Sequence, residues 1–181
     1  MDWYEPGEDT YTLIDAIEAE ALRGMVVLDL GTSTGVITQL LKKQNTVISS
    51  DMNIKALLNH SGGNLVRADL LSCINQNAFD AVAFNPPYVL DSDDPVIGGE
   101  AFGRSVIDRF IDTVRIPTVY LLVIKANKPQ EIISSMEARG YQSKVIKIRK
   151  IMGETIYIIK GILNSSQVHA QKLLNSTVLL N

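Results

Sequence analysis

Short apolar runs alternate with stretches of helical periodicity along most of this chain, and this alternation limits its fold more than any other feature. Strands are expected at 25–30, 46–50, 64–68, 79–84 and 118–125, and helices at 8–22, 36–43, 54–58, 102–114 and 129–139. Such alternation predicts an α/β fold with a mostly parallel sheet and helices on both faces. Two last strands, at 141–148 and 155–159, are joined by a short turn and must therefore be antiparallel.

The expected elements fill residues 1–161, which we take as one domain, because 181 residues suit a single hydrophobic core. The polar stretch 91–99 is rich in turn-forming residues and is expected to be a loop. Residues 162–181 are expected to form a C-terminal tail, to which the sequence assigns no role.

Composition argues against several classes of protein. A net charge of −3 does not suit nonspecific binding to nucleic acid, which calls for a basic surface. The single cysteine, Cys73, cannot form an internal disulfide, and with His60 and His169 it makes no metal-site pattern. The polar start of the chain is unlike a secretory signal, and no apolar run approaches the roughly 18 residues of a membrane span. A cytosolic or nuclear location is expected.

One short segment is locally basic, with Lys144, Lys147, Arg149 and Lys150 on an expected strand. On a strand, Lys147 and Arg149 share one face, while Lys144 and Lys150 share the other. A solvated strand edge explains these charges most simply, and a nucleic-acid contact is the alternative.

Polar residues and glycines follow the first expected strand, where open α/β sheets bind their ligands. The segment runs from Asp29 through Gly31, Thr32 and Ser33 to Gly35, and then a helix begins. The glycines allow a tight turn and a close approach to a ligand, and the helix start offers free N–H groups. The dinucleotide pattern G-x-G-x-x-G is absent, and a tight turn without a ligand remains an alternative.

Carboxylates stand at the ends of three expected strands. Asp51, about 20 residues beyond the glycine turn, suits hydrogen bonds to ribose hydroxyls, although Asp51 or Asn53 could instead cap the next helix. Asp69 could accept a hydrogen bond from the adenine amino group. With Asp29, these carboxylates disfavour a phosphate-bearing cofactor and favour S-adenosylmethionine, which carries a sulfonium and an ammonium group.

The fourth expected strand ends in the most specific feature of the chain, the sequence Asn85-Pro86-Pro87-Tyr88. The prolines fix the backbone, and the amide of Asn85 and the carbonyl of Pro86 offer two acceptors. Two converging acceptors can hold a planar NH₂ group by both protons, while Tyr88 presents an aromatic face. No general base is evident, so positioning and electrostatics must provide the catalysis. The alternative is that these residues merely end a strand.

These motifs together resemble the HemK-like glutamine-N5 methyltransferases of class I fold, and most closely their short archaeal and eukaryotic branch. The opening Tyr4-Glu5-Pro6-Gly7-Glu8-Asp9-Thr10 is similar to that branch's signature, which lies over the cofactor. The glycine turn and the motifs after it follow in the family's order. Coverage runs from about Tyr4 to about Lys160, including the later segments 98–109 and 124–129.

The resemblance implies a seven-stranded, mostly parallel sheet with one antiparallel strand, and N5-methylation of the glutamine in a Gly-Gly-Gln motif of a class I release factor. S-adenosylmethionine would be the cofactor and S-adenosylhomocysteine the product. A small zinc-binding activator protein would form a heterodimer with the chain. Residues 85–88 match the substrate motif, and the candidate cofactor contacts are Tyr4, Pro6, Glu8, Thr10, Asp29, Gly31, Thr32, Gly35, Asp51, Met52, Asp69, Leu70 and Asn85.

Three departures from the family stand out. The helical domain that precedes the catalytic domain in bacterial relatives has no counterpart here, so substrate recognition is expected from a partner or from the release factor. Ser33 stands where relatives often have glycine, which predicts weaker cofactor binding or a slightly displaced turn. The last 20 residues match nothing in the family. Two other functions stay open, an N6-adenine methyltransferase acting on DNA or RNA, and a catalytically silent binding subunit.

Overall fold

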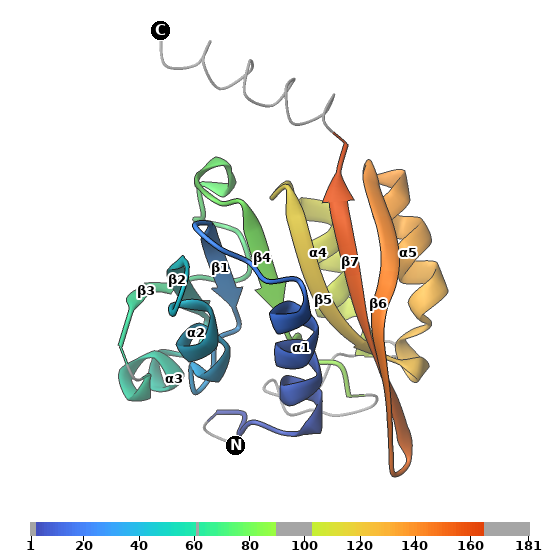
Figure 1. The fold of residues 1–181 in the computed structure, drawn as a ribbon, viewed down its shortest axis with the longest axis horizontal. Helices are drawn as coiled ribbons and strands as arrows, with labels where there is room; N and C mark the ends of the chain where they lie inside the picture. The colour runs from blue at the N-terminus through green and yellow to red at the C-terminus, as the bar shows by residue number, and fades with distance from the viewer. Residues whose placement is uncertain (1–2, 61, 90–102, 165–181) are drawn as a thin grey trace, which may run out of the picture.

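The computed structural model describes residues 3–60, 62–89 and 103–164, which form one sheet covered by helices (Figure 1). The sheet has seven strands in the order β3-β2-β1-β4-β5-β7-β6. The strands are β1 (Val26–Leu30), β2 (Thr46–Asp51), β3 (Asn64–Arg67), β4 (Ala81–Phe84), β5 (Thr118–Ile124), β6 (Tyr141–Ile151) and β7 (Glu154–Leu163). The first five are parallel, and β7 runs antiparallel to both of its neighbours, as the sequence predicted.

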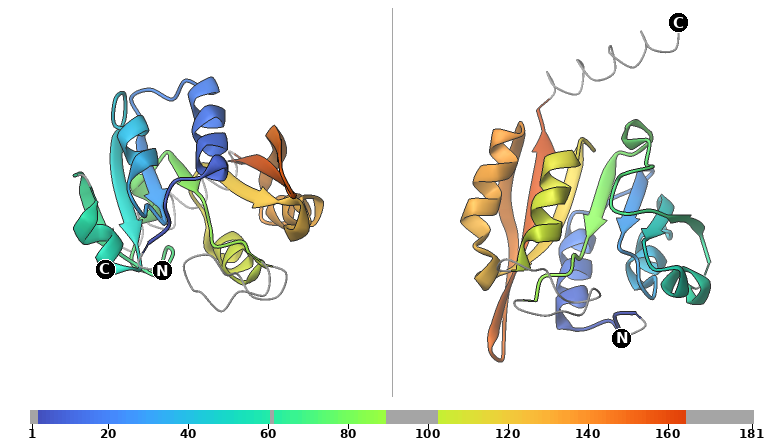
Figure 2. Two further views of the ribbon diagram at one scale, coloured as in Figure 1. Left: turned by 90° about the horizontal axis from the view of Figure 1, so that it is seen from below. Right: turned by 180° about the vertical axis from the view of Figure 1, so that it is seen from behind.

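Helices cover both faces of the sheet, which confirms the predicted α/β class. They are α1 (Glu8–Ala19), α2 (Val36–Leu41), α3 (Ile54–Asn59), α4 (Ser105–Thr113) and α5 (Pro129–Ala138), with short 3₁₀ turns η1 (Gln76–Ala78) and η3 (Lys125–Asn127). Figure 2 shows α1 and α4 on opposite sides of the sheet. Successive residues of β1 point into different cores, because Val27 packs with α1 and α2 whereas Leu28 packs with α4 and α5.

Several boundaries differ from the sequence expectation. The first helix ends at Ala19 rather than at residue 22, because Ala21 adopts a left-handed φ of 50°. The last two strands are longer than predicted, and β7 reaches Leu163, so the first two residues of the expected tail belong to the sheet. The loop expected at 91–99, residue 102 of the fourth expected helix and residues 165–181 of the tail lie outside the described residues.

Part of the basic segment on β6 binds α1 rather than standing in solvent. Lys147 and Arg149 share a face, as predicted, and both pair with Asp15, at 3.2 and 3.8 Å. Arg149 also pairs with Glu8 at 3.1 Å, at the first turn of α1. These ion pairs join the amino-terminal helix to the far edge of the sheet, and they give the segment a structural role.

The strand order reverses between β1 and β4, which are neighbours in the sheet although two strands separate them in sequence. Open α/β sheets leave a crevice for ligands at such a point, outside the carboxyl ends of the strands. In Figure 1 these ends lie at the lower edge, together with the amino-terminal segment before α1.

Candidate active site

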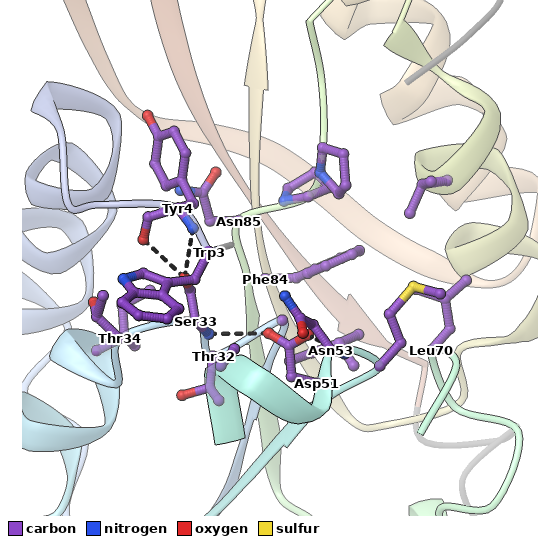
Figure 3. Close-up of a pocket in the computed structure, with 18 of the residues that line it drawn as sticks. Trp3, Tyr4, Thr32, Ser33, Thr34, Asp51, Asn53, Leu70, Phe84 and Asn85 are labelled. Carbon is purple, nitrogen blue, oxygen red and sulfur yellow. Dashed lines mark hydrogen bonds between the residues drawn. The ribbon is translucent and has the colours of Figure 1, made fainter. Parts of the chain in front are cut away.

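A cavity of about 780 Å³ opens at the carboxyl ends of β1, β2, β3 and β4. Its walls come from the glycine turn, from segments 51–56, 67–70 and 84–89, and from the amino-terminal segment (Figure 3). Val106 and Arg109 of α4 also line it. Ligand pockets of small molecules commonly span about 300–1,000 Å³, so a nucleoside cofactor fits this space.

Most of the sequence-predicted site residues meet at this cavity. Those that line it are Tyr4, Pro6, Thr10, Gly31, Thr32, Asp51, Met52, Asp69, Leu70, Asn85, Pro86, Pro87 and Tyr88. Glu8, Asp29 and Gly35 are not among the lining residues. Glu8 points instead at Arg149 of β6, because it lies on the side of α1 that faces the sheet edge. The cofactor contacts of Glu8, Asp29 and Gly35 therefore stay predictions of the family resemblance, since none of the three lines the cavity.

The turn after β1 needs its two glycines, Gly31 and Gly35, for different reasons. Gly31 lines the cavity with a φ of 66°, where a side chain would be strained. Gly35, with a φ of 79°, is the N-cap of α2, and a Cβ there would lie 2.3 Å from Nε2 of His60. His60 is buried and bonded to the Thr32 hydroxyl at 2.9 Å. Gly35 therefore makes room for a buried histidine under the turn.

Asp29 is buried beneath the same turn. Its Oδ2 accepts hydrogen bonds from the hydroxyls of Thr32 and Thr38, at 2.7 and 2.6 Å. Its Oδ1 has no partner among the described residues. Burial raises the pKa of Asp29 to about 6, despite the bonds from Thr38 and Thr32 that favour the charged form. Asp29 therefore acts on the cavity through Thr32, which it holds in the turn.

The raised pKa of Asp29 makes a prediction about stability. Because the folded state holds this proton more tightly than the unfolded state, Asp29 stabilises the fold below about pH 4, and that contribution is lost as pH rises through about 6. Two pKa units correspond to about 3 kcal/mol. The free energy of unfolding of Asp29→Asn should therefore rise relative to the wild type between pH 4 and 7. Urea titrations at both pH values measure this, and parallel pH profiles would contradict it.

Asp51 lies at the cavity wall and is fixed by backbone groups. Its Oδ2 accepts from the N–H of Ser33 at 3.1 Å, and its Oδ1 from the N–H of Asn53 at 2.8 Å. Asn53, not Asp51, caps α3, because its side chain accepts from the N–H of Lys55. Asp51 thus presents a preoriented carboxylate to the cavity, which favours the ligand-binding alternative.

Positive as well as negative side chains surround the cavity, although the sequence placed three carboxylates at strand ends. Asp69 pairs with Arg109 at 2.7 Å, and both side chains are half exposed. Lys55 and Arg67 also line the cavity. Of the three carboxylates predicted at strand ends, Asp51 and Asp69 line the cavity and Asp29 is buried below the turn. The choice of S-adenosylmethionine must therefore rest on the individual contacts.

The amino-terminal segment is fastened across the glycine turn by Ser33. The Ser33 hydroxyl accepts from the N–H of Tyr4 at 3.0 Å and donates to the Tyr4 carbonyl at 2.7 Å (Figure 3). Trp3, Tyr4 and Pro6 all line the cavity as a result. Ser33 and Leu70 line it too, both with a left-handed φ, 47° and 49°. Such strain in non-glycine residues collects at functional sites.

The motif after β4 carries an unused acceptor. The Asn85 Nδ2 donates to Oδ2 of Asp9 at 2.9 Å. Its Oδ1 is buried and has no hydrogen-bond partner among the described residues. Leaving a buried acceptor unpaired costs about 1–3 kcal/mol, so a ligand donor is the natural partner for this oxygen.

Tyr88 is held at both its hydroxyl and its backbone. The hydroxyl donates to Asp9 Oδ2 at 3.0 Å, and the Tyr88 carbonyl accepts from Nδ2 of Asn127 at 3.1 Å. Gly103 passes so close that a Cβ there would lie 2.0 Å from that carbonyl oxygen. Burial, and next the charge of Asp9, raise the pKa of Tyr88 far above its usual value. Tyr88 therefore stays a neutral phenol and is not a base.

Sequence reasoning missed several residues of the site, namely Trp3, Asp9, Arg109 and Asn127. Asp9 is the most important, and it stands in the opening signature. The sequence places it in that signature but assigns it no contact, because its partners Asn85 and Tyr88 are more than 70 residues away in the sequence. The spacing of residues along a sequence does not reveal a contact between segments so far apart.

Among residues 3–60, 62–89 and 103–164, no cluster of three or more potential ligands could hold a metal ion. No helix in the described part of the chain is long and apolar enough to cross a membrane.

Comparison with known proteins adds to this geometry. No protein-family model matches the chain. Human methyltransferase HEMK2 is 32% identical over 193 residues, covering 88% of this chain and 89% of the human protein. A Methanocaldococcus jannaschii protein, provisionally named a protein N5-glutamine methyltransferase, is 25% identical over 183 residues, covering 87% and 90%.

A solved structure is also similar. The E. cuniculi Mtq2-Trm112 complex, described as responsible for methylating the eRF1 translation termination factor, contains a chain 63% identical to this one. It superimposes with a TM-score of 0.89 and covers 91% of this chain and 100% of that chain. Together with the strand order and the cavity at its switch point, these similarities are decisive: the chain belongs to the HEMK2 family of methyltransferases, which has the class I fold.

Proposed function

We propose that the chain transfers a methyl group from S-adenosylmethionine to the side-chain amide of the glutamine in a Gly-Gly-Gln motif of a class I release factor. It does so as the catalytic subunit of a complex with a small activator protein. The observation that carries this proposal is the buried amide oxygen of Asn85 at the cavity wall, which has no hydrogen-bond partner within the described residues. Such an acceptor suits a substrate N–H donor.

The residues around the cavity fit S-adenosylmethionine. Asp51 offers a fixed carboxylate at the end of β2, which suits ribose hydroxyls. Met52, Ile54 and Leu70 provide an apolar wall for a purine ring. When bound, the cofactor supplies an electrophilic methyl group and leaves as S-adenosylhomocysteine.

An amide nitrogen is a poor nucleophile, so the chain must orient it. In the proposed mechanism, Asn85 Oδ1 and the Pro86 carbonyl each accept one N–H of the substrate amide and shift electron density toward its nitrogen. Tyr88 packs its ring against the flat amide group. The nitrogen–carbon bond forms as the carbon–sulfur bond breaks, and the surplus N–H proton then leaves to water. Since Tyr88 remains a neutral phenol, no side-chain base is assigned.

The nature of the acceptor is supported by the relatives. The E. cuniculi complex is described as acting on eRF1, and the M. jannaschii relative is named for N5-glutamine methylation. High identity to the E. cuniculi chain over nearly the whole length supports the same substrate class and a Trm112-like activator here. Zinc in that activator stays a prediction of the family resemblance.

The proposal is tested by methyl transfer from labelled S-adenosylmethionine to a release factor. The chain is co-expressed with its activator and given either the native factor or a variant with the Gly-Gly-Gln glutamine replaced by alanine. We expect labelling of the native factor and none of the variant. Equal labelling of both would mean that this glutamine is not the acceptor.

A second prediction concerns Ser33, whose hydroxyl makes both bonds to Tyr4. Ser33→Ala keeps the Cβ and removes these bonds, each worth about 0.5–1.5 kcal/mol. Because the fastened segment lines the cavity, we expect the Kd for S-adenosylmethionine to rise about tenfold, or about 1.4 kcal/mol. Titration calorimetry measures this. An unchanged Kd would show that the Ser33 bonds do not support cofactor binding.

The activator needs a surface, and one sheet edge offers it. Two exposed apolar side chains that do not line the cavity lie on α3 and β3, namely Leu58 and Leu65. β3 is the last strand on this side of the sheet, and edge strands can pair with another chain. We infer that the activator covers this edge, and that the chain alone is poorly soluble.

Leu58→Asp should therefore weaken activator binding at least about tenfold, because it places a charge in an apolar interface. Met152→Asp is the matched control, since Met152 is fully exposed at the distant β6–β7 turn. Affinity is measured by co-purification and by calorimetry. Equal binding of both variants would locate the interface elsewhere.

A further inference from the structure

The carboxylate of Asp9 is a meeting point for three segments of the site. It is 3% exposed and lies at the start of α1. Its Oδ2 accepts from Nδ2 of Asn85 at 2.9 Å and from the hydroxyl of Tyr88 at 3.0 Å. Its Oδ1 accepts from the hydroxyls of Tyr4 at 3.0 Å and Thr10 at 3.4 Å. Four donors thus converge on one buried acceptor.

This arrangement determines which way the Asn85 amide faces. An amide has a donor end and an acceptor end, whereas a carboxylate that receives four donors only accepts. The NH₂ of Asn85 must therefore face Asp9, which turns Oδ1 away from it, and this oxygen has no partner in the part of the chain that the structure describes. A reversed amide would set two oxygens against each other and would present a donor to the substrate NH₂ group.

The same oxygen of Asp9 also fixes Tyr88, so the amide and the aromatic ring are held relative to each other. The backbone of this segment has a separate support, because Asn127 binds the Tyr88 carbonyl at 3.1 Å. Loss of the Asp9 carboxylate would free the Tyr88 hydroxyl and leave Nδ2 of Asn85 only a long bond of 3.4 Å to the Thr10 hydroxyl, without removing the backbone anchor. Substituting Asp9 can therefore test how the Asn85 and Tyr88 side chains are positioned without altering the backbone support of this segment.

We propose that Asp9 is a positioning residue for methyl transfer, which sets the amide of Asn85 with its oxygen toward the acceptor nitrogen and holds Tyr88 beside it. This inference rests on the proposed function, because it assigns to Asn85 the contact with a substrate N–H. It predicts that Asp9 acts on turnover more than on cofactor binding.

Asp9→Ala tests the inference in the complex with the activator. We expect kcat for the release factor to fall about 10²-fold, as when an oriented catalytic donor or acceptor is lost, while the Kd for S-adenosylmethionine changes less than about fivefold. Asp15→Ala is the control, because Asp15 lies on the same helix and, within the described part of the chain, forms its ion pairs with Lys147 and Arg149 of β6. Wild-type kcat in a folded Asp9→Ala variant would overturn the inference.

A reciprocal exchange gives a result that a purely structural role would not produce. Asn85→Asp places two carboxylates together and should be nearly inactive. Adding Asp9→Asn restores a donor–acceptor pair, because the amide now at position 9 donates to the carboxylate now at position 85. The second oxygen of that carboxylate then remains to accept from the substrate. We expect the double variant to exceed Asn85→Asp in kcat at least about tenfold, and no gain would contradict the proposed orientation.

The two variants of the exchange nearly preserve side-chain size, so they remain informative if Asp9→Ala fails to fold. The wild-type complex in the same assay separates the two proposals. Absence of methyl transfer by the wild type would overturn the proposed function, whereas an active wild type with no rescue in the exchange would overturn only the role of Asp9.

Discussion

Replacing Asn85 with alanine is expected to lower kcat by about 10² or more, because an oriented acceptor in a water-excluded site contributes several kcal/mol to transition-state stabilisation. The cofactor should still bind, since Asp51, Leu70 and the glycine turn are untouched. Single-turnover labelling of the release factor measures the rate, and calorimetry measures the Kd for S-adenosylmethionine.

Asn75→Ala is the control for this substitution. Asn75 is exposed and caps η1, which precedes the amino end of β4, at the other end of the sheet from the cavity. It should leave kcat within about twofold of the wild type, since surface changes have small effects. An Asn85→Ala complex that methylates at the wild-type rate would remove Asn85 from the mechanism.

The second large effect is expected at Gly35, in the free energy of unfolding. Alanine at this position would have to adopt the left-handed φ of 79°, and its Cβ would lie 2.3 Å from Nε2 of His60. The left-handed backbone costs about 1–2 kcal/mol. Overpacking adds about 1–3 kcal/mol, and His60 cannot retreat freely because it is buried and bonded to Thr32. We therefore expect a loss of about 2–5 kcal/mol in urea unfolding.

Gly24→Ala provides the matched control for Gly35→Ala. Gly24 has a similar φ of 67°, but nothing lies within 4 Å of a Cβ built there. It should lose only the backbone contribution of about 1–2 kcal/mol. The difference between the two variants measures the overlap with His60, and equal losses would show that the histidine moves aside at no cost.

The features that the sequence predicted correctly are those encoded locally. Apolar runs placed the five parallel strands, and a short turn with no room for a crossover made β6 and β7 antiparallel. Asn85 to Tyr88 could be assigned because two prolines after a buried strand have few other uses. Helix and strand ends differ from the prediction, and α1 ends early because of the left-handed backbone at Ala21.

The features that the sequence did not predict depend on contacts between distant segments. Glu8 was expected at the cofactor but turns to Arg149, about 140 residues later in the chain. Asp29 was expected at the rim but is buried under the turn, where its carboxylate holds two threonines. Asp9 serves Asn85 and Tyr88 only because the start of α1 lies against the end of β4. None of these contacts produces a periodic pattern in the sequence from which it could have been predicted.

The central claim is that this site methylates a protein amide rather than an adenine. The most direct test offers both acceptors in one reaction, with labelled S-adenosylmethionine and the chain in complex with its activator. One acceptor is a release factor carrying Gly-Gly-Gln, and the other is a DNA oligonucleotide containing adenines. We predict that the label appears on the release factor and, after proteolysis, on the peptide that holds this glutamine. Label on the oligonucleotide with none on the release factor would contradict the claim.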